Sequence, residues 1–255
     1  AVRRNAEIRG SFLGFFKPLV IVGFAAILLL AQPDFGSAVL LIGISFTVLF
    51  LAGARLRDVS LTLGPVVLGF ALLAKFSPYR MKRLTGFWDP WADPYGDGFQ
   101  LTQSLIAIGS GEWTGLGLGG SVQKLFYLPE AHTDFIFAVI AEEFGLLGSL
   151  VMILLYVLLI WRAFVIARTA AGREQFFPAY VAFGLGVWLA LQAAINLGVN
   201  MGVLPTKGLT LPLVSYGRSS LLVTLAALGL LLRIDLENRG IASATKRRVN
   251  GRVAP

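Results

Sequence analysis

The chain alternates between long apolar stretches and short polar ones, with one long polar stretch near its middle. A helix needs about 20 mostly apolar residues to span a bilayer. Six stretches approach that length, and they cover residues 15–31, 37–54, 59–76, 135–161, 177–201 and 209–232. The pattern therefore predicts an all-α fold, a polytopic transmembrane helix bundle formed by a single domain over residues 1–255.

Lysine and arginine are distributed unequally between the two sides of this predicted bundle. Such residues accumulate on the cytoplasmic side of membrane proteins. With six spans both termini lie on one side, and that side carries fifteen of these residues against six on the other. The six are Lys75, Arg80, Lys82, Arg83, Lys124 and Lys207. We therefore expect cytoplasmic termini, a cytoplasmic tail over 238–255 and one long extracytoplasmic loop over 77–134.

Composition supports a membrane protein and excludes several other classes. Of the 255 residues 56% are hydrophobic and only 14% are charged, whereas soluble domains average about 25% charged residues. The net charge of +8 reports membrane topology in so apolar a chain and does not indicate nucleic acid as a partner. The absence of cysteine excludes thiolate metal and redox sites, and a single histidine excludes most zinc clusters.

The long loop contains two features that favour specific chemistry without deciding it. Trp88, Trp91 and Tyr95 alternate with Asp-Pro turns, which suits either an anchor at the membrane–water interface or stacking against a sugar. Residues 100–109 are mildly amphipathic and predict a short helix. Six glycines follow between residues 109 and 120. They predict either a flexible hinge or a backbone cradle for an anion.

The end of the loop, residues 128–137, concentrates titratable side chains. The only histidine, His132, lies between Glu130 and Asp134. Thr133 or Asp134 is placed to cap the following helix, an interaction worth about 1 kcal/mol. A catalytic carboxylate would occupy the same position, at the edge of the apolar slab with cations nearby. The two interpretations are compatible, and the spacing alone does not choose between them.

Two glutamates follow about two turns further along the predicted fourth span. A charge inside the apolar slab costs roughly 2.5 kcal/mol or more. Glu142 and Glu143 differ by one helical position, so they are not expected to face the same groove. We expect Glu142 to lie in a cavity and Glu143 to pair with another group within the bundle.

Amides and a carboxylate elsewhere are expected to have structural roles. Gln192, Asn196 and Asn200 recur at every fourth position of the predicted fifth span and form one polar stripe. Such stripes join helices more often than they bind substrate. Asp34 is expected to cap the second span, with a place in the outer cavity as the alternative.

Taken together, these residues resemble the SEDS family of cell-wall polymerases, and most closely its cell-division branch. The similarity extends in order over nearly the whole chain. It rests on Lys17-Pro18-Leu19, Gln32-Pro33-Asp34-Phe35-Gly36, residues 50–54, Tyr79-Arg80, Trp88-Asp89-Pro90-Trp91, residues 100–104, residues 128–142, residues 204–213 and Ser215-Tyr216-Gly217. The family has ten spans, so the resemblance implies that this chain corresponds to the last six and lacks the first four.

The resemblance implies a glycosyltransferase that polymerises lipid II at the outer face of the bacterial inner membrane. Asp134 matches the aspartate to which the family's catalysis is ascribed, as a general base for the acceptor 4-hydroxyl. Arg80 and Lys207 match cations important for activity, and we expect both to bind substrate near the departing diphosphate. Further substrate contacts are expected from residues of the matched segments, namely Glu130, His132, Glu142 and Ser215.

The resemblance also implies partners and a location. Expected ligands are lipid II and a glycan linked to undecaprenyl diphosphate. Expected protein partners are a class B penicillin-binding transpeptidase and division regulators of the FtsQ, FtsL, FtsB and FtsN type, at the division septum. No cofactor or resident metal is expected with certainty. A divalent cation, Mg²⁺ or Mn²⁺, would suit the diphosphate, although no cluster of ligands in the sequence indicates one.

Two other functions compete with this interpretation. A transporter that flips lipid II would also carry charges inside its spans, but transporters hold their substrate near the midplane of the membrane. The polar chemistry of this chain is instead concentrated in one outer loop. A non-catalytic scaffold for division proteins is the third possibility.

Arg218 departs from the family pattern. The family carries Ser-Tyr-Gly-Gly-Ser-Ser, but here Ser215-Tyr216-Gly217 is followed by Arg218. Arginine inside a span needs a partner or a route to water. Arg218, Glu142 and Glu143 each lie eight or nine residues inside their predicted spans, so we expect Arg218 to pair with one of the glutamates or to open into the same cavity. The alternative is that it snorkels toward the membrane surface or pairs with one of the family's first four helices.

Overall fold

The structure is a computed structural model, and it describes residues 12–32, 34–76, 81, 86–96, 98–125, 128–206 and 208–240. Within these ranges every regular element is helical. The helices are α2 (Phe12–Ala31), α3 (Phe35–Leu51), α4 (Leu56–Lys75), α6 (Phe99–Ser110), α7 (Ile136–Gly172), α8 (Phe176–Asn200) and α9 (Arg218–Asn238). The predicted all-α class is confirmed, and so is the short helix expected in the long loop.

Four helices are long and apolar enough to cross a membrane. They contain Gly14–Ala31, Ile136–Gly172, Phe176–Asn200 and Arg218–Asn238. Helix α3 is apolar but has 17 residues, and α4 contains Pro65. The chain is therefore a multi-pass membrane protein, whereas six crossings and the sidedness of the loops stay predictions.

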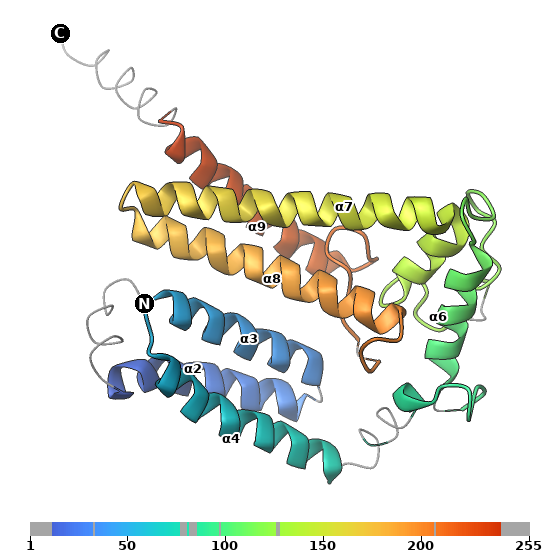
Figure 1. Cartoon of the computed structure of the whole chain (residues 1–255), viewed down its shortest axis with the longest axis horizontal. Helices are drawn as coiled ribbons and strands as arrows, with labels where there is room; N and C mark the ends of the chain where they lie inside the picture. Colours follow the sequence, from blue (N-terminus) through green and yellow to red (C-terminus); the bar gives the residue numbers. More distant parts are fainter. Residues whose placement is uncertain are drawn as a thin grey trace.

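Helices α7 and α8 form the centre of the bundle and run antiparallel, joined by a short turn (Figure 1). Helix α9 packs on both of them, and α3 lies along the other side of α8. Helices α2 and α4 pack on α3. Helix α6 lies across the end of α7 that is remote from this turn (Figure 1). The long loop therefore returns to the bundle at the end where α7 begins.

Asp34 caps α3, as the sequence predicts. Its carboxylate accepts a hydrogen bond from the backbone N–H of Ser37 at 3.0 Å. The first N–H groups of a helix have no partner within the helix, so a short acidic side chain in front of them stabilises its start. The capping role is confirmed.

The last helix begins later than the apolar pattern predicts. The predicted span covers 209–232, but α9 begins at Arg218. The preceding segment contains Pro212, which lacks the backbone N–H that a helix interior requires. Side chains on other helices bind the carbonyls of this segment, since Gln192 donates to Thr210 at 2.9 Å and the Tyr156 hydroxyl donates to Pro212. The segment is an ordered connection that packs against α7 and α8.

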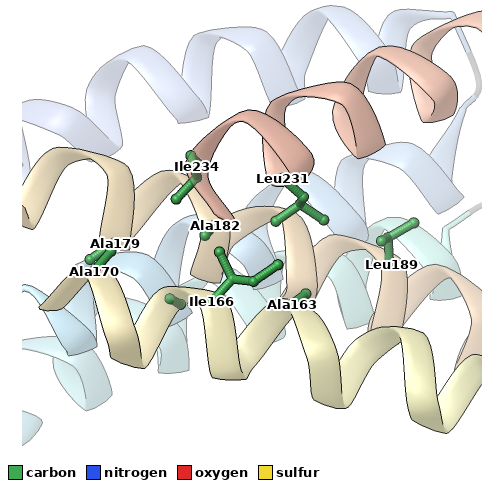
Figure 2. Close-up of a cluster of buried hydrophobic side chains, with 9 residues drawn as sticks. Ala163, Ile166, Ala170, Ala179, Ala182, Leu189, Leu231 and Ile234 are labelled. Carbon is green, nitrogen blue, oxygen red and sulfur yellow. The ribbon is translucent and has the colours of Figure 1, made fainter. Parts of the chain in front are cut away.

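A tightly packed apolar cluster joins α7, α8 and α9 (Figure 2). It lies toward the turn between α7 and α8, the end of the bundle that is remote from α6 (Figure 1). Small residues dominate it, which allows the helix backbones to approach closely. The buried members are Ala163, Ile166, Ala167, Ala170, Ala179, Ala182, Leu189, Leu231 and Ile234. We call these nine apolar residues the alanine cluster. Nearby, Arg162 of α7 forms an ion pair with Asp235 of α9 at 3.2 Å.

Candidate functional site at the start of helix α7

Asp134 lies immediately before α7 and outside its first turn. The N-cap of α7 is Phe135, and this end has no side-chain cap. The prediction that Thr133 or Asp134 caps the helix is therefore wrong. The hydroxyl of Thr133 instead donates to the Glu130 carboxylate at 2.6 Å, so it is turned away from the helix. Asp134 itself is partly buried.

Three consecutive backbone carbonyls of this segment each accept hydrogen bonds from other parts of the chain. The His132 carbonyl accepts from the backbone N–H of Tyr216 at 2.8 Å. The Thr133 carbonyl accepts from the Ser215 hydroxyl at 2.5 Å. The Asp134 carbonyl accepts from the side-chain amides of Asn196 and Asn200, at 2.8 and 2.9 Å. The backbone on which Asp134 sits is therefore fixed from several sides.

The polar stripe on α8 supplies these amides, and its predicted structural role is confirmed. Asn196 and Asn200 are 1% and 0% exposed, which leaves their side chains no open surface. Besides Asp134, Asn196 donates to the Leu209 carbonyl at 2.6 Å. Gln192, one turn away, donates to the Thr210 carbonyl. The stripe thus joins α8 to the start of α7 and to the segment that leads into α9.

The Asp134 carboxylate lies beside Gly208. A Cβ atom at Gly208 would stand 3.1 Å from Oδ2 of Asp134, which is tighter than ordinary van der Waals contact. Gly208 is exposed, so the carboxylate is near the surface of the bundle. Lys207, which precedes Gly208 in the sequence, and Arg80 lie outside the described residues, and their predicted roles as substrate cations stay predictions.

The structure gathers three other predicted residues around Asp134. Glu130 and His132 are both exposed, and Glu130 has a backbone φ of 56°, a conformation uncommon for residues other than glycine. Ser215 is buried, and its hydroxyl oxygen also accepts from the Leu211 N–H at 2.6 Å. With these two bonds Ser215 has a structural role here. Substrate contact by the three residues stays a prediction.

Glu142 lies apart from this group. The residue is 1% exposed, and its carboxylate accepts from the Ser121 hydroxyl at 2.5 Å and from the backbone N–H of Val122 at 3.0 Å. The backbone N–H of Gln123 lies 3.4 Å from the same carboxylate. Glu142 thus holds the end of the glycine-rich loop, while its contact with substrate stays a prediction.

Glu143 contacts the same stretch of loop. It pairs with Lys124 at 2.5 Å, which fits the expected ion pair. The two carboxylates have different partners, although residues 121–124 wrap around this part of α7 and reach both of them. The expected place of Glu142 in a cavity is wrong, because this residue is buried against the loop.

The glycine-rich loop is inserted into a break in α7. Backbone N–H groups at its end bind the Glu142 carboxylate of α7, while a hinge motion and a cradle for a substrate anion stay predictions. Gly145 interrupts the helix with φ 64° and ψ −162°. In a regular helix the carbonyl of Glu142 would bind the N–H of Leu146. Here that carbonyl accepts from Leu116 at 2.9 Å, and the Leu146 N–H donates to Glu112 at 2.8 Å. The next helical bond, from the Leu147 N–H to the Glu143 carbonyl, is replaced in the same way by bonds to Trp113 and Gly117.

This insertion requires glycines and explains how α7 accommodates its charges. A Cβ atom at Gly111 or Gly115 would overlap the carbonyl oxygens of Ala141 and Glu143. Residues 146–172, after the break, exceed the roughly 20 that a membrane crossing needs. Glu142 and Glu143 both precede the break. A membrane crossing by residues 146–172 therefore does not require either glutamate to enter the apolar slab.

Arg218 does not pair with either glutamate. It is the first residue of α9, it is exposed, and its guanidinium lies 3.4 Å from the Tyr216 hydroxyl. The expected pairing is wrong because the helix begins at Arg218 instead of nine residues earlier, and because Glu143 is paired with Lys124.

Exposed aromatic side chains mark the long loop. Trp88 and Tyr95 are 87% and 88% exposed, and Trp91 is 58% exposed. Membrane anchoring and sugar stacking both use exposed rings, so both interpretations stay open. Among the described residues no group of three or more histidine, aspartate and glutamate side chains could hold a metal ion, so these residues do not build a cage for a divalent cation.

Sequence reasoning missed two features of the site. The roles of Asn196 and Asn200 in binding the Asp134 carbonyl depend on which helix faces α8, which periodicity does not reveal. The amide stripe was nevertheless a usable signal. The other feature is Gly208, whose missing side chain leaves room for the carboxylate, and a lone glycine in a loop gives no such signal.

The chain is similar to known proteins over most of its length. The sequence model of the FtsW, RodA and SpoVE family, described as cell cycle proteins, matches residues 1–240. The probable peptidoglycan glycosyltransferase FtsW of Thioalkalivibrio sulfidiphilus is 60% identical over 235 residues, which cover 92% of this chain and 59% of that protein. The protein of the same name from Legionella pneumophila is 56% identical over 238 residues, 93% of this chain and 60% of that one.

Solved structures agree with these relatives. A peptidoglycan synthase complex that coordinates polymerization and crosslinking contains a chain with a TM-score of 0.72 and 32% identity, and the match covers 92% of this chain and 66% of that one. The rod shape determining protein RodA of Thermus thermophilus has a TM-score of 0.59 and 30% identity, with 92% and 61% covered. The chain spans about 60% of the length of the curated relatives that it matches. It belongs to the FtsW, RodA and SpoVE family of cell cycle proteins.

Proposed function

We propose that the protein carrying this chain is a peptidoglycan glycosyltransferase that polymerises lipid II into glycan strands. The observation that carries the proposal is the Asp134 carboxylate, held beside Gly208 on a segment whose carbonyls are bound one after another. A general base has to be held within hydrogen-bond reach of the proton that it removes. Relatives named as probable peptidoglycan glycosyltransferases support the same reaction.

In the proposed reaction the Asp134 carboxylate takes the proton of the acceptor 4-hydroxyl. The oxygen of that hydroxyl forms a bond to the anomeric carbon of the donor strand. The bond from this carbon to undecaprenyl diphosphate breaks, and its electron pair leaves with the diphosphate. Attack from the face opposite the leaving group inverts the anomeric carbon.

The departing diphosphate carries the charge that this reaction must stabilise. We assign Arg80 and Lys207 to that role, since cations placed where charge develops lower the barrier. A divalent cation enters the proposal only as a counterion of the diphosphate, because the described residues build no cluster of ligands for it. Lys207→Arg should retain more activity than Lys207→Met, although arginine and lysine differ in geometry.

We further propose that the protein works with a class B penicillin-binding transpeptidase and with division regulators in the bacterial inner membrane. The similarity to a chain of a peptidoglycan synthase complex supports a transpeptidase partner. Relatives named FtsW support a place at the division septum. The asymmetry of lysine and arginine supports a cytoplasmic C-terminus.

The contacts of Glu142 weigh against a flippase. Ionisable side chains on a transport pathway face a water-filled cavity, whereas this carboxylate is buried and bound to the loop residues Ser121 and Val122. Glu143 is paired with Lys124. Both charges therefore have structural partners.

The test uses the protein extracted from its native membrane, alone and with a class B transpeptidase, and incubated with labelled lipid II. Ladders of glycan on a gel would support the proposal. Translocation of lipid II in vesicles without ladders would support a flippase. Transpeptidase binding with neither activity would leave only the scaffold.

A further inference from the structure

The first hydrogen bond of α7 is interrupted by a side chain from α8. In a regular helix the N–H of Ala138 would donate to the carbonyl of Asp134. Here the Ala138 N–H is shared between the Phe135 carbonyl at 3.0 Å and Oδ1 of Asn200 at 3.2 Å, and Nδ2 of Asn200 donates to the Asp134 carbonyl at 2.9 Å. The amide of Asn200 thus contacts both backbone groups, and it binds the carbonyl of Asp134, which lies outside the helix.

Asn196 provides a second link to the same carbonyl. Its NH₂ group donates to the carbonyls of Asp134 and Leu209, at 2.8 and 2.6 Å. An amide NH₂ has two hydrogens, one for each of these carbonyls. Leu209 follows Gly208, and the Asp134 carboxylate lies beside Gly208. The Asn196 amide therefore links the backbone of Asp134 to the segment that the Asp134 carboxylate faces.

Asn200 is itself fixed in place. Its Nδ2 also lies 2.9 Å from the Asn196 carbonyl, and its own carbonyl accepts from the Ser104 hydroxyl of α6 at 2.9 Å. Asn200 is fully buried, and Ser104 is buried as well. A buried amide with all its partners in place has one orientation, because turning it would leave buried polar atoms unpaired.

We infer that Asn196 and Asn200 are positioning residues that hold the Asp134 backbone outside α7 and so direct its carboxylate toward Gly208. This inference rests on the proposed role of Asp134 as the general base. Only an amide of this length fits at position 200: aspartate lacks the donor for the Asp134 carbonyl, and leucine lacks both groups. Displacing a catalytic group by about 1 Å can cost on the order of 100-fold in rate.

The test compares Asn200→Leu with the matched control Gln192→Met. Both changes replace a buried amide of the same stripe by an apolar side chain of similar size, but Gln192 binds Thr210 and does not contact the segment of Asp134. We expect Asn200→Leu to lower kcat for lipid II polymerisation about 100-fold with KM unchanged. Gln192→Met should retain the wild-type kcat at a comparable melting temperature.

Equal losses of kcat in the two variants, or a rise in KM alone for Asn200→Leu, would overturn the inference. Should Asn200→Leu fail to fold, Asn200→Asp takes its place, since it keeps the shape and the acceptor for Ala138 but loses the donor to Asp134. An Asn200→Asp variant with wild-type kcat would refute the inference.

If Asp134→Asn abolishes activity while both position-200 variants retain it, only the inference fails. If the wild type makes no glycan, the proposed function fails and the inference falls with it.

Discussion

The two ends of α7 and α8 are held together by different physical means. At the end near Asp134, the amides of Asn196 and Asn200 and the hydroxyl of Ser215 bind individual backbone carbonyls. At the opposite end the alanine cluster joins the same helices by apolar contact (Figure 2), and the polar contacts there, the Arg162–Asp235 ion pair and the Asn238 amide on the Ile166 carbonyl, link α7 to α9. Five of the nine members of that cluster are alanine, and none of them has a polar side chain.

The two kinds of contact have different roles: apolar packing holds helices together, whereas hydrogen bonds fix the position of individual backbone groups. Small apolar residues let helices approach closely, and their contribution is spread over many weak contacts that specify no single atom. A hydrogen bond to a carbonyl, by contrast, fixes a distance and a direction. We conclude that the alanine cluster holds the helices together, while the amide and hydroxyl contacts fix the backbone of Asp134.

The largest loss of stability is expected from Gly111→Ala, which tests the loop insertion at the polar end. The new Cβ atom would overlap the Ala141 carbonyl and prevent the loop from entering the break in α7. We expect a loss of about 3 kcal/mol, measured as a lower melting temperature in detergent. Gly109→Ala is the control, because a Cβ there meets nothing within 4 Å. A melting temperature equal to that of the control would contradict the inserted loop.

Overpacking the alanine cluster should lower stability without changing the chemistry. Ala182 is fully buried in this cluster, so Ala182→Leu should cost about 2 kcal/mol. The kcat of the folded protein should stay at the wild-type value, since Asp134 lies at the other end of the helices. A fall in kcat at a temperature where the variant is fully folded would show that the two ends are not independent.

A smaller effect is expected from Glu142→Gln. The carboxylate accepts from Ser121 and from the backbone of Val122, and an amide replaces one acceptor oxygen by a donor. We expect a loss of about 1.5 kcal/mol and faster hydrogen exchange over residues 121–124, read by mass spectrometry. Unchanged exchange in that segment would show that Glu142 does not hold the loop.

The smallest effect is expected from Arg218→Gly. The side chain is exposed, and its contact is with the Tyr216 hydroxyl at 3.4 Å. Surface substitutions of this kind change stability by less than about 0.5 kcal/mol. Activity and melting temperature should both match the wild type. Loss of activity without loss of stability would give Arg218 a role at the site that its contacts do not indicate.

Apolar runs predicted the helices of the bundle, and local spacing predicted the cap at Asp34 and the short helix α6. These features depend on residues close together in the sequence. The break in α7 could not be predicted in this way, because the non-helical conformation of Gly145 accompanies the insertion of residues 112–117, which lie far from it in the sequence. The apolar run continues through the break and conceals it.

The same limit applies to the site. The titratable cluster at residues 130–134 and the amide stripe on α8 were both evident, but their mutual contact depends on how α7 and α8 pack. The start of α9 was missed because the segment after Leu209 is apolar, and its ordered conformation depends on carbonyl contacts with Gln192 and Tyr156.

Asp134→Asn tests the central claim most directly. The isosteric amide keeps the shape of the side chain and the carbonyl bonds to Asn196 and Asn200, but it cannot accept the proton of the acceptor hydroxyl. General bases contribute about 100-fold to 10,000-fold in rate, so glycan synthesis from labelled lipid II should fall by at least about 100-fold, with melting temperature and transpeptidase binding unchanged. Substantial glycan synthesis by this variant would contradict the account.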